Sequence, residues 1–200
     1  MAPGPPRSLV LATRNEHKLA ELREILAGVE VTPLDPEIEL PPEDGETFAE
    51  NALGKARAAA RETGSAAIAD DSGITAAALG GRPGVRSARF AGEGASDEQN
   101  LNLLIGELEP HPDRSVAYVC AMAYVDPLGE EIVCEAECAG TLAAHPRGSG
   151  GFGYDPAFVP SDTPAGDERT MAELSPAEKH AISHRGRAAR RLAARLGIPA

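Results

Sequence analysis

The sequence predicts an α/β domain with a mixed sheet, divided into two lobes around a cleft. Apolar runs that predict strands alternate with segments in which apolar residues recur at helical spacing. A long hairpin over residues 116–142 then interrupts the alternation and adds antiparallel strands. No stretch has the composition of a linker between independent domains. We therefore expect one domain over residues 8–200, preceded by a flexible tail over residues 1–7.

The first half of the chain begins with a βα unit. Residues 8–13 are a short apolar run that predicts a strand, and residues 16–27 carry leucines and an isoleucine at helical spacing. Residues 31–43 are rich in proline and acidic residues, which predicts an extended segment or a loop. A second helix is predicted over residues 47–63, and Gly64 ends it.

A buried strand follows the second helix. Residues 66–69 are an apolar run that we expect to end at the acidic residues that follow it. Capping boxes at Ser96 and Ser175 mark the starts of two helices. The remaining predicted elements are a helix ending at Leu108, strands over residues 116–125 and 131–142 joined by the turn Asp126-Pro127-Leu128-Gly129, a glycine-rich loop over residues 148–154 and a basic helix ending near Gly197.

Composition limits the partners of the chain. The formal net charge of −12 argues against binding to a nucleic-acid polymer, because such binding needs Lys and Arg at the phosphates. A small phosphorylated ligand held by a local basic cluster or a divalent metal is compatible with this charge. No segment approaches the roughly 20 apolar residues of a membrane span. With no signal peptide, the odd set of Cys120, Cys134 and Cys138 predicts reduced, buried thiols in the cytoplasm.

Asp70 and Asp71 are the most informative pair of residues, and Ser72 and Gly73 follow them directly. A strand that ends there would bring carboxylates to the rim of a sheet, where α/β proteins bind ligands. Adjacent strand residues point to opposite faces. One carboxylate could therefore face a cleft while the other braces a loop or a metal. An Asx-type turn that closes the strand is the alternative.

The turn between the first strand and the first helix carries a second group of polar residues. Anions bind at helix N-termini because unpaired backbone N–H groups and the positive end of the dipole meet there. Thr13 and Asn15 add polar side chains, and Lys18 adds a charge. The turn is not a Walker A loop, because Gly-x-x-x-x-Gly-Lys is missing. A capping box of Thr13 and Glu16 is the alternative.

Two further charged residues are candidates for the same chemistry. Glu43 lies in an acidic loop, where it is either a solvated charge or, with Asp71, part of the oxygen ligand set that Mg²⁺ prefers. Water and substrate phosphates would complete that set. Lys55 lies inside the second predicted helix, where it is either a surface residue or, facing the cleft, a partner for phosphate.

The C-terminal half carries the candidates for holding a flat ligand. Phe152 is flanked by glycines, which allow the backbone to approach a ligand closely, and its ring can stack on a base. Asp155 can accept hydrogen bonds from ring N–H groups. A tight hairpin with a plugging phenylalanine is the alternative. Lys179, His184 and Arg185 either supply donors in fixed places or are surface residues.

Several stretches of the chain occur in an order that resembles the Ham1/inosine triphosphate pyrophosphatase family. They are Thr13-x-Asn15-x-x-Lys18, Ala69-Asp-Asp-Ser-Gly73, Gly151-Phe-Gly-Tyr-Asp-Pro156 and Ser183-His-Arg-Gly186, with further likeness at residues 47–52, 79–84 and 87–89. The resemblance spans roughly residues 8–196. It implies an elongated α/β fold and a homodimeric, Mg²⁺-dependent enzyme. It also implies hydrolysis of ITP, dITP and XTP to the monophosphate and pyrophosphate, which cleanses the nucleotide pool.

The resemblance implies roles for individual residues. Asp71 would be the general base and, with Glu43, would bind Mg²⁺. The residues that would hold the substrate are Thr13, Arg14, Asn15, Lys18, Lys55, Ser72, Phe152, Gly153, Tyr154, Asp155, Lys179, His184 and Arg185. Arg14 stands where the family often has glycine. Donors from His184 or Arg185 would favour the 6-oxo group of hypoxanthine and xanthine over the 6-amino group of adenine.

Three other functions compete with this interpretation. A Maf-like nucleotide pyrophosphatase would prefer other bases, but Phe152 and the His184-Arg185 pair favour the first family. A non-catalytic nucleotide sensor would not need Asp71 and Lys18. A hydrolase triad of Ser72, His184 and Asp155 would lack the Gly-x-Ser-x-Gly elbow that presents such a serine.

Overall fold

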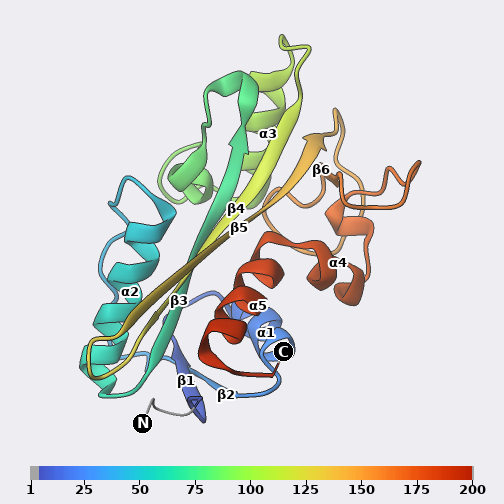
Figure 1. Ribbon diagram of the computed structural model, residues 1–200. Helices are drawn as coiled ribbons and strands as arrows, with labels where there is room; N and C mark the ends of the chain where they lie inside the picture. The colour runs from blue at the N-terminus through green and yellow to red at the C-terminus, as the bar shows by residue number, and fades with distance from the viewer. Residues whose placement is uncertain (1–4, 200) are drawn as a thin grey trace. The chain divides into compact units, whose positions relative to one another are not determined.

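Strands and helices alternate along the first part of the chain, as Figure 1 shows on a computed structural model that describes residues 5–199. The strands are β1 (Ser8–Leu11), β2 (Glu30–Pro33), β3 (Ala67–Ala76), β4 (Ser115–Val125), β5 (Glu131–Leu142) and β6 (Phe158–Pro160). The α-helices are α1 (Glu16–Ile25), α2 (Phe48–Thr63), α3 (Asp97–Leu108), α4 (Pro176–Ile182) and α5 (His184–Leu196). Short 3₁₀ helices are η1 (Ala77–Leu79), η2 (Gly84–Arg89) and η3 (Met171–Glu173). Of the predicted tail over residues 1–7, residues 1–4 lie outside the described residues.

The strands combine parallel and antiparallel pairing. Within residues 5–199, six strands form one sheet in the order β2-β1-β3-β4-β5-β6. β1 runs parallel to β2, where Leu9 lies opposite Val31, and parallel to β3, where Leu11 lies opposite Ile68. β5 pairs antiparallel with β6. The predicted α/β class with a mixed sheet is confirmed.

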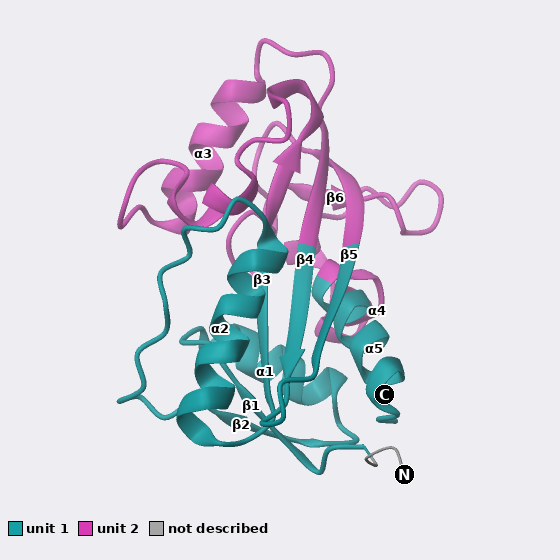
Figure 2. Cartoon of the chain, turned by 60° about the vertical axis from the view of Figure 1, so that its left-hand side comes forward, with its two compact units in different colours: residues 1–71, 120–136, 185–200 teal, residues 72–119, 137–184 magenta. Residues whose placement is uncertain are grey.

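The chain divides into two compact units, which Figure 2 shows in different colours. Unit 1 comprises residues 1–71, 120–136 and 185–200, and unit 2 comprises residues 72–119 and 137–184. Strands β3, β4 and β5 each contribute residues to both units. The substrate cleft and the single domain over residues 8–200 stay predictions.

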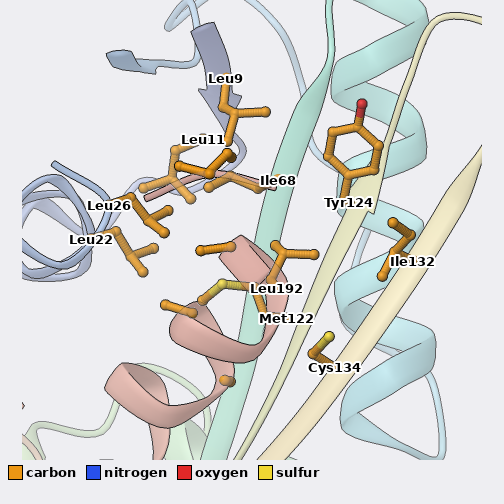
Figure 3. Close-up of a cluster of buried hydrophobic side chains, with 14 of the residues drawn as sticks. Leu9, Leu11, Leu22, Leu26, Ile68, Met122, Tyr124, Ile132, Cys134 and Leu192 are labelled. Atoms are coloured by element: carbon orange, nitrogen blue, oxygen red, sulfur yellow. The ribbon is translucent and has the colours of Figure 1, made fainter. Parts of the chain in front are cut away.

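Unit 1 has a hydrophobic cluster on each face of its strands. On one face, residues of α1 and α5 cluster with Leu9, Leu11 and Ile68, as Figure 3 shows. On the other face, alanines of α2 cluster with Ala67 and Ala69. The two sets alternate along β3 because neighbouring strand residues point to opposite faces. The small side chains allow α2 to lie close to the strands.

Unit 2 has one main cluster. Helix α3 contributes Leu101, Leu104 and Leu108 at helical spacing, and they pack in the same cluster as Ile74 of β3 and Phe158 of β6. Phe158 is fully buried. The cluster therefore ties α3 to two strands that are far apart in the sequence.

Capping boxes fix where three of the α-helices begin. Ser96 and Ser175 form the capping boxes of α3 and α4 that the sequence predicts. Thr47 forms a third capping box, with Glu50, at α2. Each box satisfies backbone N–H groups that the first helical turn leaves unpaired.

β3 is longer than the sequence predicts, and this places the acidic pair differently. The strand runs through Asp70 and Asp71 to Ala76, so both the expected strand end and the Asx-type turn are wrong. Gly73 does not turn the chain. A Cβ atom on Gly73 would lie 2.3 Å from Ser87 Oγ and 2.6 Å from the carbonyl oxygen of Gly84, so glycine is needed there for close packing.

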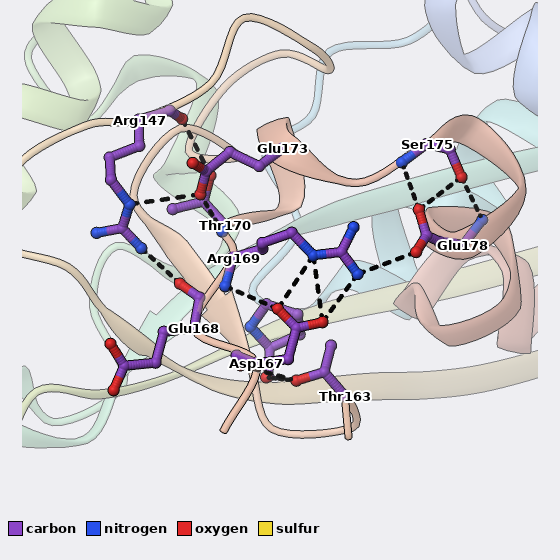
Figure 4. A network of polar contacts seen from close by, with 10 residues as sticks. Arg147, Thr163, Asp167, Glu168, Arg169, Thr170, Glu173, Ser175 and Glu178 are labelled. Atoms are coloured by element: carbon purple, nitrogen blue, oxygen red, sulfur yellow. Dashed lines mark hydrogen bonds and ion pairs between the residues drawn. The ribbon is translucent and has the colours of Figure 1, made fainter. Parts of the chain in front are cut away.

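A polar network in unit 2 fixes the segment that leads into α4, as Figure 4 shows. The guanidinium of Arg169 donates hydrogen bonds to Asp167 Oδ2 at 2.8 Å and to Glu178 Oε1 at 2.9 Å. Glu178 also completes the capping box of Ser175. The network therefore holds the start of the helix that carries the next residue, Lys179.

The three cysteines are buried thiols, as predicted. Burial, with the negative charge of Asp70, raises the pKa of Cys120 to about 12. None of the helices within residues 5–199 is long and apolar enough to cross a membrane.

Candidate functional site

The residues that the sequence predicts for the site lie in two groups, one in each unit. Unit 1 holds Thr13, Arg14, Asn15, Lys18, Glu43, Lys55, Asp70, Asp71 and Arg185. Unit 2 holds Ser72, Phe152, Gly153, Tyr154, Asp155, Lys179 and His184. Within each group several members contact one another directly, and their roles toward a substrate stay predictions.

In unit 1, Asn15 is the N-cap of α1. Its Oδ1 accepts hydrogen bonds from the backbone N–H groups of His17, at 2.9 Å, and Lys18, at 3.2 Å. Thr13 Oγ1 in turn accepts the N–H of Asn15 at 3.1 Å. The alternative capping box of Thr13 and Glu16 is therefore wrong. An anion at this helix start would meet the positive end of the helix dipole.

Arg14 lies in the same turn but contacts a loop of the protein. Its guanidinium donates hydrogen bonds to the carbonyl oxygens of Leu34, Asp35, Pro36 and Ile38, with N···O distances of 3.2 Å for Asp35 and Pro36. These bonds hold the segment that follows β2 beside the start of α1. Arg14 therefore braces the turn, and its contact with phosphate stays a prediction.

Asp70 is the centre of a buried charge cluster. Its Oδ2 lies 2.9 Å from Lys18 Nζ and 3.1 Å from Arg185 Nε, and its backbone carbonyl accepts a hydrogen bond from Lys55 Nζ at 2.8 Å. Burial alone would raise its pKa, but the charges of these three cations hold the pKa well below its usual range. Asp70 therefore stays ionised, which suits a counter-ion rather than a group that gains a proton.

Arg185 joins three elements of unit 1. Its Nη1 lies 2.5 Å from Oε2 of Glu21 on α1, while its Nε binds Asp70 on β3. Its side chain is 3% exposed, so the surface alternative is wrong. The contact with a base stays a prediction. Glu21 is not among the residues that the sequence predicts for the site. Its helical spacing from Lys18, which places both side chains on one face of α1, is the signal that could have identified it.

Asp71 points to the other face of β3, toward α2. Its Oδ2 accepts a hydrogen bond from Asn51 Nδ2 at 2.9 Å. Burial raises the pKa of Asp71, and the negative charge of Glu43 adds to the rise, against the opposing effects of Lys55 and Asn51. Asn51 is not among the residues that the sequence predicts for the site. A buried amide on a helix needs a hydrogen-bonding partner, and that requirement is the signal that could have found it.

Lys55 links Glu43 to the backbone of β3. Its Nζ forms an ion pair with Glu43 and also donates to the carbonyl of Asp70. Burial would lower the pKa of Lys55, but the charges of Asp70 and Glu43 raise it above its usual value. Lys55 is 6% exposed, so the alternative of a surface lysine is wrong.

Asp71 and Glu43 fit the expected Mg²⁺ site in their chemistry. Carboxylate oxygens are the hard ligands that Mg²⁺ prefers. The two carboxylates lie close enough for Glu43 to raise the pKa of Asp71, a repulsion that a bound cation would relieve. Among the described residues, no three His, Cys, Asp or Glu side chains form a ready metal cage. Mg²⁺ commonly uses one or two carboxylates and takes the rest from water and phosphate.

In unit 2, Asp155 is the centre of the second group. Its Oδ1 accepts a hydrogen bond from the Tyr118 hydroxyl at 3.0 Å. Its Oδ2 accepts the Phe152 N–H at 3.0 Å and Lys179 Nζ at 2.9 Å. A carboxylate has about four acceptor positions, so most of its capacity is used within the protein. Asp155 organises this group, and its contact with a base stays a prediction.

Other contacts fix the glycine-rich loop. Gly153 N–H donates to Oδ2 of Asp97, at the start of α3, over 2.7 Å, and the Tyr154 hydroxyl donates to the Ser87 carbonyl over 2.7 Å. The connection from β5 to β6 covers residues 143–157, so the alternative of a tight hairpin is wrong. The loop is therefore a long connection held at its glycines and its aromatic residues.

The remaining predicted residues of unit 2 are Ser72 on β3, Lys179 inside α4 and His184 at the start of α5. Ser72 is half-buried on β3, directly after the acidic pair. Lys179 Nζ lies 5.0 Å from the centroid of the Phe152 ring, a cation–π contact. His184 begins α5 and is buried, so for both Lys179 and His184 the surface alternative is wrong.

Comparison with known proteins places these motifs in a family. The model of the Ham1 family matches residues 9–195. A dITP/XTP pyrophosphatase from Mycobacterium bovis is 52% identical over 193 residues, which cover 90% of this chain and 90% of that protein. One from Geobacter sulfurreducens is 48% identical over 198 residues, which cover 94% of this chain and 96% of that protein.

Solved structures agree with the fold. A HAM1 protein from Coxiella burnetii matches with a TM-score of 0.83 and 43% identity, over 95% of this chain and 98% of that chain. A dITP/XTP pyrophosphatase from Mycobacterium abscessus matches with a TM-score of 0.74 and 48% identity, over 92% of this chain and 98% of that chain. Since both the family model and these relatives span nearly all of its length, this chain belongs to the Ham1 family.

Proposed function

We propose that this chain hydrolyses non-canonical purine nucleoside triphosphates, namely ITP, dITP and XTP, to the monophosphate and pyrophosphate. Relatives named dITP/XTP pyrophosphatase, which are 48–52% identical over nearly the whole chain, support this substrate class. One structural observation supports a hydrolytic reaction, namely the different surroundings of two adjacent carboxylates. Asp70 and Asp71 are adjacent on β3, yet the first is held by cations and the second accepts a hydrogen bond from an amide.

The triphosphate would bind at the start of α1. Backbone N–H groups and the helix dipole favour an anion there, and the ammonium of Lys18 lies within the same turn. Lys18 is paired with Asp70, and Lys55 is paired with Glu43. Each ammonium has three N–H donors, so phosphate oxygens can share it with the carboxylate. Phosphoryl chemistry depends mainly on such positioning and neutralisation of charge.

Asp71 is the residue we propose as general base. It would take a proton from the attacking water as the bond between the α- and β-phosphoryl groups breaks and pyrophosphate leaves. Asp70 is unsuited to that step, because its Oδ2 is shared by Lys18 and Arg185. The hydrogen bond from Asn51 to Asp71 Oδ2 would fix the direction of the carboxylate.

We propose Mg²⁺ as the cofactor, with Asp71 and Glu43 as its ligands. When bound, Mg²⁺ supplies neutralising charge at the phosphate oxygens and polarises water. The ion pair with Lys55 holds the Glu43 carboxylate in place. Lys55 itself is fixed by its hydrogen bond to the carbonyl of Asp70.

The base would be held by the group in unit 2. The Phe152 ring can stack on any base, so stacking gives affinity without selectivity. Selectivity must then come from directional donors, and His184 is a buried imidazole in this group. An N–H donor placed to bond the 6-oxo group would, with adenine, meet the 6-amino group, which is also a donor. Such a contact forms no hydrogen bond, and a polar contact left unpaired in this way rejects a substrate strongly.

We also propose that the chain is a homodimer and that it works in the cytoplasm. The family resemblance supports the first statement, and three cysteines that are thiols support the second. Sedimentation at micromolar concentration tests the dimer, and a monomer at every concentration would contradict it.

The test of the proposed function is a pyrophosphate assay over a panel of nucleotides. ITP, dITP, XTP, ATP, GTP and dTTP are each supplied with MgCl₂ or with EDTA. We expect fast release from the first three, little from ATP and GTP, and none in EDTA. A preference for dTTP would indicate the Maf-like function. Binding of ITP without pyrophosphate release would indicate a nucleotide sensor.

A further inference from the structure

Tyr118 on β4 contacts two of the residues that we place at the base. Its hydroxyl donates to Asp155 Oδ1 at 3.0 Å. Its ring stacks on the His184 imidazole with a centroid separation of 4.6 Å and an interplanar angle of 11°. No motif of the chain includes Tyr118, and it is 7% exposed. All three residues belong to unit 2.

The far side of the Tyr118 ring is fixed by the core. Phe158, which is fully buried, stacks on Tyr118 with a centroid separation of 4.4 Å and an interplanar angle of 29°. Phe158, Tyr118 and His184 therefore form a stack that starts in the hydrophobic cluster of unit 2. The plane of the imidazole is set by this stack, because aromatic rings in contact resist tilting.

The hydroxyl of Tyr118 acts on a different set of residues. Asp155 uses its other oxygen to hold the Phe152 N–H and Lys179 Nζ. A hydrogen bond from Tyr118 to Oδ1 fixes the rotation of the carboxylate, and with it the direction of Oδ2. The hydroxyl thus acts on the position of the stacking ring, while the aromatic ring of Tyr118 acts on the histidine.

We propose that Tyr118 is a positioning residue for the base. Its ring fixes the plane of His184 and so determines base selectivity, and its hydroxyl fixes the carboxylate of Asp155 and so determines how tightly any base is held. This inference rests on the proposed function. A hydrogen bond weakens steeply when donor and acceptor are misaligned, so an imidazole N–H selects a 6-oxo group only if its plane is fixed. Tyr118 does not touch the substrate in this account and acts only through its two neighbours.

Two substitutions separate the two contacts. Tyr118→Leu removes the ring, and Tyr118→Phe removes only the hydroxyl. For Tyr118→Leu we expect the ratio of kcat/KM for ITP to that for ATP to fall by about 3- to 10-fold, the scale of one aromatic pair. For Tyr118→Phe we expect this ratio to stay within about twofold while KM rises about 3- to 10-fold for both nucleotides, the scale of one hydrogen bond.

Tyr124→Leu is the matched control, because Tyr124 is on the same strand, is 6% exposed and lies in the cluster of unit 1. It should lower the melting temperature without changing the ratio. An equal fall in the ratio for Tyr124→Leu and Tyr118→Leu would overturn the inference, since any loosened core would then have the same effect. An unchanged ratio in Tyr118→Leu would overturn it as well.

A measurement that needs no substrate tests the geometry. The Tyr118 ring should shift the His184 ring protons upfield in the NMR spectrum, and His184→Gln assigns them. Tyr118→Leu should move these signals downfield, while Tyr118→Phe should leave them in place; signals that do not move in Tyr118→Leu would overturn the inference. If the wild-type chain releases no pyrophosphate from ITP, the proposed function is overturned as well. If the wild-type chain is active but the His184 ring-proton signals do not move in Tyr118→Leu, only the role of Tyr118 is overturned.

Discussion

At the residue scale, the alternation of a strand gives two adjacent carboxylates different surroundings. Asp70 faces Lys18 and Arg185, and Asp71 faces Asn51. The sequence predicts that one of the pair braces the structure and the other faces the chemistry, since this needs only the period of two along a strand. It does not predict which partners each finds, because Arg185 is more than a hundred residues away in the chain.

Asp71→Asn should nearly abolish turnover while the fold stays intact. The amide loses the proton acceptor and weakens the metal site, and loss of a general base typically costs about 10²–10⁴-fold. Turnover of ITP and the melting temperature are measured for both chains. A folded variant that keeps more than about a tenth of wild-type turnover would show that Asp71 is not the base.

Arg185→Ala should destabilise the fold strongly. The change leaves Asp70 buried beside one cation fewer, and breaking a buried pair by removing one partner typically costs about 3–5 kcal/mol. Chemical denaturation of each variant measures its free energy of unfolding. Arg61→Ala is the control, because Arg61 is 73% exposed and its ion pair with Glu62 should be worth less than about 1 kcal/mol. If both variants lose the same small free energy of unfolding, the buried ion pair between Arg185 and Asp70 does not stabilise the fold.

At the scale of elements, local signals predict helix starts well and strand ends poorly. The capping boxes at Ser96 and Ser175 involve residues three apart, so the sequence contains both partners. β3 was expected to end at Asp70 because acidic residues and glycine usually close a strand. The strand continues because Ile74 and Ala76 are buried in the cluster of unit 2, which is a long-range effect.

Gly73→Ala and Gly106→Ala should have opposite effects on stability. A Cβ atom on Gly73 would meet Ser87 Oγ at 2.3 Å, so we expect a loss of about 1–3 kcal/mol from overpacking. A Cβ atom on Gly106 in α3 has nothing within 4 Å, so we expect a gain of about 0.5–1 kcal/mol from helix propensity. Denaturant unfolding measures both. A stabilised Gly73→Ala variant would contradict the close packing of β3.

The network before α4 should make stability depend on pH in the acid range. Hydrogen bonds from Arg169 and Ser175 lower the pKa of Glu178 from its usual 4.5 to about 2. A lowered pKa stabilises the fold above the unfolded value of 4.5, and this stabilisation is lost as pH falls toward 2. The melting temperature of wild type should therefore exceed that of Glu178→Gln at pH 6. The difference between the two melting temperatures should shrink as the pH falls from 4.5 to about 2. A difference that grows on acidification would contradict the assignment.

At the scale of the whole molecule, the sequence predicts the α/β class but not the strand order. Apolar periodicity identifies the longer strands and the helices before their partners are known. It misses the short strand β6, and it leaves β2 within a segment predicted to be extended or a loop. The order β2-β1-β3-β4-β5-β6 depends on which strands pair, and pairing is decided by contacts between distant segments. In the same way, the motifs indicate which residues belong to the site. The internal bonds of Asp155 could be found only from the folded chain.

The initial products of ITP hydrolysis show which phosphoanhydride bond breaks. Phosphorus NMR of a reaction with MgCl₂ follows each species from the first turnover. We expect IMP and pyrophosphate to appear together in equal amounts, with no IDP at any time, because water attacks the α-phosphorus. Appearance of IDP and orthophosphate as the first products would contradict it.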